Sequence, residues 1–119
     1  MTDDLFTAEV VDAETEDVRS VAVSGEIDLS NANRFETVLH AAFDGWEAGV
    51  LDLSPCSYID SSGLNALLRF RHATEGRLRL VVVAGASTRR VLEIAGLGAL
   101  FSIFSSRVEA EESVRRGPT

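Results

Sequence analysis

The spacing of the apolar residues changes from one stretch of the chain to the next, and this change constrains the fold more than any other feature. Residues 6–12 and 18–24 alternate between apolar and polar, which is typical of strands with one buried face. The polar break at 14–17 between them suits a hairpin turn. We therefore expect the chain to begin with two antiparallel strands.

From residue 30 onward, the sequence predicts helices that alternate with short strands. Apolar side chains recur at spacings of three and four between Phe35 and Phe43, as they do on the buried face of a helix. Ser30 or Asn31 suits the start of this helix, because a short side-chain oxygen can accept a free backbone N–H. Strands are then expected at 50–53, 78–84 and 101–104, with helices at 61–74, 87–95 and 107–116.

Individual residues set several of these boundaries. Pro55 has no backbone N–H to donate, so the strand at 50–53 should end close to it. Ser87 is expected to cap the helix at 87–95, and Gly96 to end it. The run at 78–84 is rich in Val, which is typical of a strand buried on both faces.

The resulting order of elements, ββαβαβαβα, predicts an α/β fold. Strands separated by helices favour a mostly parallel sheet with right-handed crossovers. We expect a mixed, mostly parallel sheet with an N-terminal antiparallel hairpin and about four helices. At 119 residues the chain is too short for two domains with cores of their own, so we expect a single domain over 1–119, with an ordered core at about 5–115.

Charge and cysteine content limit the kinds of partner and the cellular compartment that we expect. The net charge of −8 should repel nucleic-acid phosphates and anionic lipids. Cys56 is the single cysteine, which is typical of a reducing compartment, and such a residue is more often buried than redox-active. The N-terminus lacks the basic and apolar regions of a signal peptide. We therefore expect a cytoplasmic protein with no direct nucleic-acid or membrane partner.

The segment Asp60-Ser61-Ser62-Gly63-Leu64 stands where a strand region gives way to a helix, the usual place for binding sites in open α/β sheets. Free N–H groups at a helix start stabilise an anion, so a phosphoryl group on Ser61 would lie in a favourable field. The same residues also fit a plain helix cap, with Asp60 or Ser61 holding backbone N–H groups and Gly63 allowing close packing. The residues alone leave both interpretations open.

The segment Gly25-Glu26-Ile27-Asp28 closes the second predicted strand. Glycine permits an unusual backbone angle or a close approach at Gly25. Glu26 and Asp28 should point to the same side, where paired carboxylates could coordinate a metal, contact an arginine of a partner, or simply solvate a turn. These alternatives also stay open on the residues alone.

Both segments, in this order, resemble motifs of the STAS family, and specifically of the bacterial anti-sigma factor antagonists. The resemblance extends over nearly the whole chain, from about residue 6 to 110, and implies an STAS-like α/β fold. A third stretch completes the pattern with Arg90, Leu92, Gly96-Leu97, Phe101 and Ile103-Phe104.

The resemblance implies a phosphorylation switch. Ser61 would be phosphorylated by a partner that is both a serine kinase and an anti-sigma factor. The dephosphorylated form would bind this partner and free the sigma factor, and a PP2C-type phosphatase would reset the switch. Asn65 departs from the family, in which small residues are common at this position. The implied partner-binding residues are Gly25, Glu26, Asp28, Asp60, Ser61, Ser62, Gly63 and Asn65.

Two other functions are weighed against this switch. An enzyme would need Ser61 close to a base, but on one helix His72 would lie about 16 Å along the axis from it. Two histidines and one cysteine also lack the spacing of a metal site, so we expect no enzymatic activity, metal or cofactor. The alternative function is an STAS module of a stress-signalling complex or a transporter regulatory subunit.

Overall fold

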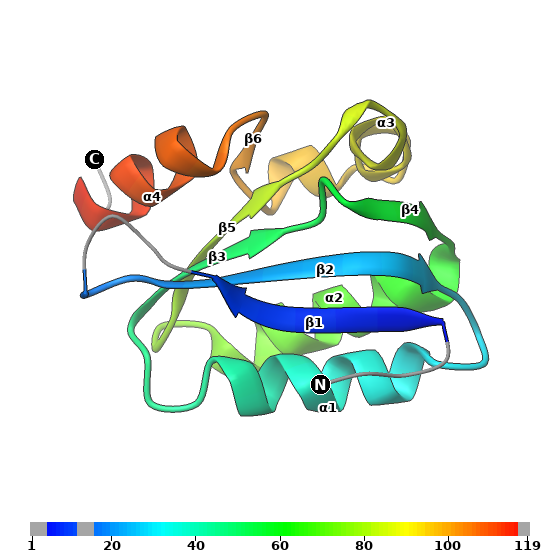
Figure 1. Ribbon diagram of the computed structural model, residues 1–119, viewed down its shortest axis with the longest axis horizontal. Helices are drawn as coiled ribbons and strands as arrows, with labels where there is room; N and C mark the ends of the chain where they lie inside the picture. Colours follow the sequence, from blue (N-terminus) through cyan, green and yellow to red (C-terminus); the bar gives the residue numbers. More distant parts are fainter. Residues whose placement is uncertain (1–4, 12–15, 117–119) are drawn as a thin grey trace.

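A computed structural model describes residues 5–11 and 16–116, which form a six-stranded sheet with helices on both of its faces (Figure 1). Residues 1–4, 12–15 and 117–119 lie outside the described part of the chain. They include half of the hairpin turn expected at 14–17 and most of the loose ends expected at 1–4 and 116–119, of which Arg116 instead closes the last helix. The strands are β1 (Phe6–Val11), β2 (Arg19–Ile27), β3 (Ala48–Asp52), β4 (Cys56–Ile59), β5 (Arg79–Val83) and β6 (Ile103–Phe104). The helices are α1 (Ala32–Ala42), α2 (Ser61–Thr74), α3 (Ala86–Ile94) and α4 (Arg107–Arg116), with a short 3-10 helix, η1 (Leu97–Ala99).

The sheet has the order β1-β2-β3-β5-β6, and β4 also pairs with β2. Strand β1 is antiparallel to β2, with Phe6 opposite Gly25, whereas the other pairs are parallel. This arrangement confirms the predicted mixed sheet with its antiparallel N-terminal hairpin.

Strand β2 has two successive neighbours on the same side. Its first half, from Arg19 to Ala22, pairs with β3. Its second half, from Gly25 to Ile27, pairs with β4 after a shift of register between Gly25 and Glu26. The chain ends β3 before Pro55, as predicted, but then forms β4, which the sequence did not predict.

The core has two layers. The larger cluster lies between the sheet and helices α1, α2 and α3, and its fully buried side chains include Phe35 and Phe70. The smaller cluster lies under α4, where Ala110 and Val114 cover the opposite face of the sheet. Neighbouring residues of β5 contribute to different clusters, which confirms that this strand is buried on both faces.

The capping of two helices differs from the prediction. Helix α3 begins at Ala86 with Gly85 as its N-cap, so Ser87 lies inside the first turn and is not the cap. Asn31 does occupy the N-cap position of α1, but its side chain makes no capping hydrogen bond there. At the other end of α3, Gly96 has a φ of 79° and ends the helical turn, as predicted.

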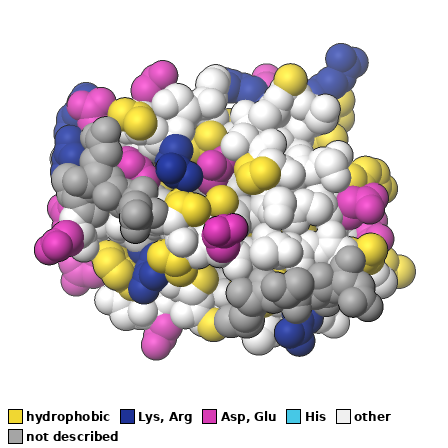
Figure 2. All heavy atoms as spheres, viewed as in Figure 1, with side chains coloured by type: hydrophobic (Ala, Val, Ile, Leu, Met, Phe, Trp, Pro, Cys, Tyr) yellow, Lys and Arg dark blue, Asp and Glu magenta, His cyan; other side chains and the backbone are white. Residues whose placement is uncertain are grey.

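The surface carries no simple charge pattern on the face seen in Figure 2, where acidic side chains are spread among arginines and apolar groups. Of the helices within residues 5–11 and 16–116, none has the length and apolar character that a membrane crossing requires.

Candidate functional site

The first residue of helix α2 is Ser61, and its side chain is exposed. The cap of this helix is Asp60, whose Oδ1 accepts hydrogen bonds from the backbone N–H groups of Ser62 at 2.9 Å and Gly63 at 3.3 Å. Within the described residues, the Ser61 hydroxyl makes no hydrogen bond. Asp60 therefore holds the start of the helix, and the hydroxyl of Ser61 faces solvent without a structural role.

Gly63 brings the first turn of α2 against the sheet. A Cβ atom at this position would lie 2.7 Å from the Cγ2 of Ile27 and 2.7 Å from the Cγ1 of Ile59. These contacts are shorter than carbon atoms tolerate, so a glycine is needed for this approach. The predicted packing role of Gly63 is confirmed, and because the residue is buried it acts on the site through this packing.

Gly25 lies directly against the backbone of Leu5. Its φ is +97°, and a Cβ atom there would collide with the backbone oxygen of Leu5. The same oxygen accepts a hydrogen bond of 2.8 Å from the backbone N–H of Glu26. Both of the predicted reasons for a glycine, the unusual backbone angle and the close approach, are present.

The turn between β2 and α1 is held by side chains. The Oδ1 of Asp28 accepts hydrogen bonds from the N–H of Ser30 at 2.9 Å and from its hydroxyl at 2.6 Å. The Oδ1 of Asn31 accepts from the N–H of Asp28 at 2.9 Å, and its Nδ2 donates to the carbonyl of Glu26 at 2.9 Å. Asp28 thus stabilises the turn, while the Glu26 side chain is exposed.

The pairing of β2 with β4 brings the two predicted segments together. Glu26 lies opposite Tyr58 in the register, and Ile27 lies opposite Ile59. The N–H of Asp60 then donates to the carbonyl of Ile27 at 3.2 Å. Ser61 and the β2–α1 turn are therefore neighbours at the carboxyl ends of adjacent parallel strands. Asn65 is exposed one helical turn after Ser61, on the same side of α2.

Two exposed apolar residues beside this site were missed by the sequence reasoning. Leu29 follows Asp28 and exposes 82% of its surface, and Tyr58 exposes 49%. The signal that could have revealed Leu29 is a leucine between polar turn residues. The exposure of Tyr58 could not be predicted without strand β4, which the sequence did not predict.

Cys56 is the first residue of β4, lies opposite Gly25 in the register, and is 5% exposed. Burial raises the pKa of its thiol above the ordinary value of 9.0 and outweighs the lowering effect of the hydrogen bond with the Tyr58 backbone, while the carboxylate of Glu26 raises it slightly further. Its Sγ donates to the carbonyl of Tyr58 at 3.2 Å. Since the reactive thiolate is disfavoured, the structure supports a small buried residue rather than a redox sensor.

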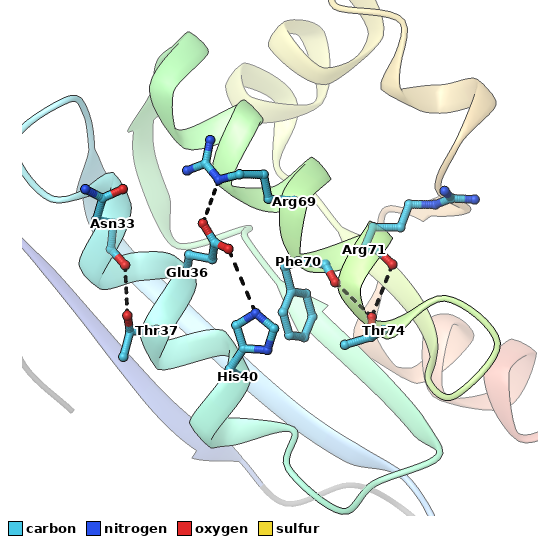
Figure 3. A network of polar contacts seen from close by, with 8 residues as sticks. All are labelled: Asn33, Glu36, Thr37, His40, Arg69, Phe70, Arg71 and Thr74. Carbon is cyan, nitrogen blue, oxygen red and sulfur yellow. Dashed lines mark hydrogen bonds and ion pairs between the residues drawn. The ribbon is translucent and has the colours of Figure 1, made fainter.

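The histidines lie away from Ser61. Helix α2 runs unbroken to Thr74, which keeps His72 close to the opposite end of the helix from Ser61. His40 packs its ring against Phe70, with 4.9 Å between ring centroids, and its Nε2 lies 3.9 Å from a carboxylate oxygen of Glu36 (Figure 3). In the part of the chain that the structure describes, no three His, Cys, Asp or Glu residues are grouped to hold a metal.

Comparison with known proteins gives results that agree with this geometry. Residues 9–110 match the family model of the STAS domain. The anti-sigma-F factor antagonist RsfB of Mycobacterium tuberculosis is 33% identical over 102 residues, which cover 84% of this chain and 84% of that protein. An anti-sigma factor antagonist from Mycobacterium paratuberculosis, known from its crystal structure, is also 33% identical, with a TM-score of 0.84 over 96% of this chain and 97% of that chain.

A more distant structure shares the fold alone. The murine anion transporter Slc26a9, in its inward-facing state, has a TM-score of 0.76 at 18% identity. The match covers 88% of this chain but 19% of the transporter. The same fold thus occurs in proteins of different kinds, so the choice among functions depends on the site.

Proposed function

The chain belongs to the STAS domain family, and we propose that it is an anti-sigma factor antagonist whose partner binding is switched off by phosphorylation of Ser61. Two relatives at 33% identity carry the name of such antagonists, and each match covers most of both chains. The observation that carries the proposal is the placement of an exposed, unbonded serine hydroxyl at the start of α2, beside the β2–α1 turn.

Ser61 can be modified without loss of a structural contact. The cap of α2 depends on Asp60, so a phosphoryl group on the Ser61 oxygen would break no hydrogen bond within the described residues. It would add about −1.5 to −2 charges and three strong acceptors to a small exposed side chain. The N–H groups of Ser62 and Gly63 are already bonded to Asp60, so within the protein this charge would be favoured by the positive end of the α2 helix dipole. A contact surface fitted to a neutral hydroxyl would not favour it.

The reaction is a phosphoryl transfer from ATP within the complex. The Ser61 oxygen would attack the γ-phosphorus, ADP would leave, and a base on the kinase would accept the hydroxyl proton. We propose that the kinase is itself the anti-sigma factor, so that the unphosphorylated chain occupies it and frees the sigma factor. A PP2C-type phosphatase would hydrolyse the phosphoserine and restore binding, and all these partners would meet in the cytoplasm.

The proposed contact surface combines residues with two kinds of role. Glu26, Ser61 and Asn65 have exposed side chains that a partner can reach, and Ser62 is half-buried beside them. The remaining residues of the surface hold the backbone in place: Gly25, Asp28, Asp60 and Gly63.

The first test compares proteins captured from the native cytosol by wild type, Ser61→Asp and Ser87→Asp. Ser87 is a matched control because it is an exposed serine in the first turn of another helix. We expect wild type and Ser87→Asp to capture an ATP-binding serine kinase, and Ser61→Asp to lose it. A transporter subunit or a large sensor assembly, captured equally by all three, would instead support the alternative STAS module and reject the switch.

The second test locates the phosphoryl group. The captured kinase is purified and incubated with ATP and either wild type or Ser61→Ala, and the products are mapped by mass spectrometry. We expect phosphate on Ser61 and none on the Ser61→Ala variant, which should still bind the kinase. Phosphate on Ser62 in both proteins would move the assignment by one residue.

A further inference from the structure

Leu29 is more exposed than any other large apolar residue in the described part of the chain, at 82%. Exposed leucines are common on protein surfaces, so exposure alone does not mark a binding site. Leu29 differs because it lies at the tip of a turn that other side chains hold in a fixed shape.

The turn around Leu29 is rigid in the free protein. Asp28 accepts two hydrogen bonds from Ser30, and Asn31, which is 4% exposed, is bonded to both Asp28 and Glu26. The backbone N–H of Asn31 also donates to the carbonyl of Asp28 at 3.2 Å. The turn has therefore already lost the conformational freedom that a flexible loop loses on binding.

Leu29 is also close to the phosphorylation site. Its Cα lies at most about 7.6 Å from that of Ile27, because consecutive Cα atoms are 3.8 Å apart. The carbonyl of Ile27 accepts a hydrogen bond from the residue that precedes Ser61. In the chain, the leucine is flanked by the polar residues Asp28, which is half-buried, and Ser30, which is exposed. An apolar centre within a polar rim is the usual anatomy of a protein interface.

We propose that Leu29 is the apolar anchor of this surface and fills an apolar pocket on the anti-sigma factor, beside the site that receives Ser61. This inference rests on the proposed function and adds a contact to it. Asp28 and Asn31 are positioning residues, since their polar groups bond within the turn and hold Leu29 outward. The specificity of this chain for its partner therefore depends on a side chain outside the two motifs.

The test uses the anti-sigma factor that the capture experiment identifies, after purification. Its affinity is measured by calorimetry for wild type, Leu29→Ser, Leu29→Met and the control Ile94→Ser, whose isoleucine is 77% exposed on α3. We expect Leu29→Ser to weaken binding about 10- to 100-fold, as loss of an interface anchor does. Leu29→Met should retain most of the affinity, and Ile94→Ser should bind like wild type.

Asn31→Ala tests the positioning role. In the wild-type background it should weaken binding, whereas in the Leu29→Ser background it should cost no further affinity. Its effect on the melting temperature should be the same in both backgrounds. If the two affinity losses simply multiply, the positioning role is wrong.

The results separate this inference from the proposed function. If Leu29→Ser binds like wild type while Ser61→Asp does not bind, Leu29 is no anchor and the switch still stands. If wild type binds no anti-sigma factor at all, both are overturned.

Discussion

In helix α2, the buried side chains near the carboxyl end and the exposed side chains near the amino end have different roles. At the carboxyl end, Phe70 is completely buried and packs against Phe43 and His40, with ring centroids 5.9 and 4.9 Å away. The hydroxyl of Thr74 donates to the carbonyl of Phe70 at 3.0 Å (Figure 3). At the amino end, the side chains of Ser61 and Asn65 face solvent. One helix thus combines a part that holds the core with a part that is free to meet a partner.

This contrast indicates where stability and recognition should separate. Substitutions of buried side chains near the carboxyl end should change the free energy of unfolding and leave the exposed surface unaltered. Substitutions of exposed atoms at the amino end should do the reverse. Substitutions of Gly63 and Asp60 should affect both stability and recognition, because Gly63 packs the amino end of α2 against the sheet and Asp60 caps it.

The largest expected effect is that of Phe70→Ala. Removing a fully buried ring leaves a cavity and should lower the free energy of unfolding by about 3–5 kcal/mol, measured by urea denaturation. Phe70→Leu keeps much of the volume and should lose clearly less. Partner affinity, measured on the folded fraction, should not change. A loss below about 1 kcal/mol would show that this end does not hold the core.

Gly63→Ala should affect both properties. The added methyl group would overlap Ile27 and Ile59, and such overpacking typically costs about 1–3 kcal/mol. Because α2 must shift away from β2, the spacing between Ser61 and the β2–α1 turn should change and partner binding should weaken. Gly98→Ala is the control, since a Cβ atom there would meet nothing within 4 Å. Equal stability of the two variants would contradict the close-packing role.

Asp60→Ala should remove the cap of α2 and lower the free energy of unfolding by about 1 kcal/mol. Asp60→Asn retains an acceptor oxygen and should lose less. Ser61→Ala, at the next position, should change stability by less than about 0.5 kcal/mol, because its hydroxyl faces solvent. If Ser61→Ala were the more destabilising of the two, the roles of cap and acceptor would have to be exchanged.

The smallest expected effect concerns the exposed ion pair between α1 and α2. The Nε of Arg69 lies 2.8 Å from the Oε1 of Glu36, and the Arg69 side chain is 52% exposed (Figure 3). A double-mutant cycle of Arg69→Ala and Glu36→Ala should give a coupling of about 0.2–1 kcal/mol that declines at high salt. A larger, salt-independent coupling would mean that this region contributes more to the core than its exposure indicates.

Much of the fold was predictable because its signals are local. The alternation in β2, the Val-rich run of β5 and the helical spacing in α1 each reflect a buried face within one segment. Strand β4 was missed for the opposite reason. It has only four residues, and it forms because the second half of β2 has hydrogen-bonding groups available after β3 has ended. That condition depends on distant segments.

The candidate site also contains residues with local signals and residues whose role depends on distant segments. Asp60 and Ser61 were proposed from their place at the start of a helix, which is a local feature and is where the structure has them. The role of Asn31 was not predictable, because an asparagine before a helix normally caps it. Here its amide bonds to Glu26 and Asp28 instead. The choice between these partners is decided by where β2 ends, and spacing alone does not give that position.

The hydrogen bond from Asp60 to Ile27 has a consequence for how a signal can be transmitted. It fixes Ser61, the proposed acceptor, and the β2–α1 turn to one strand, at a constant separation. A phosphoryl group on such a frame has no hinge to move, so the modified and unmodified proteins should have superimposable backbones. The information would then be carried by charge on an unchanged shape, and the rate of switching would depend on the kinase and the phosphatase, without a slow rearrangement of this chain.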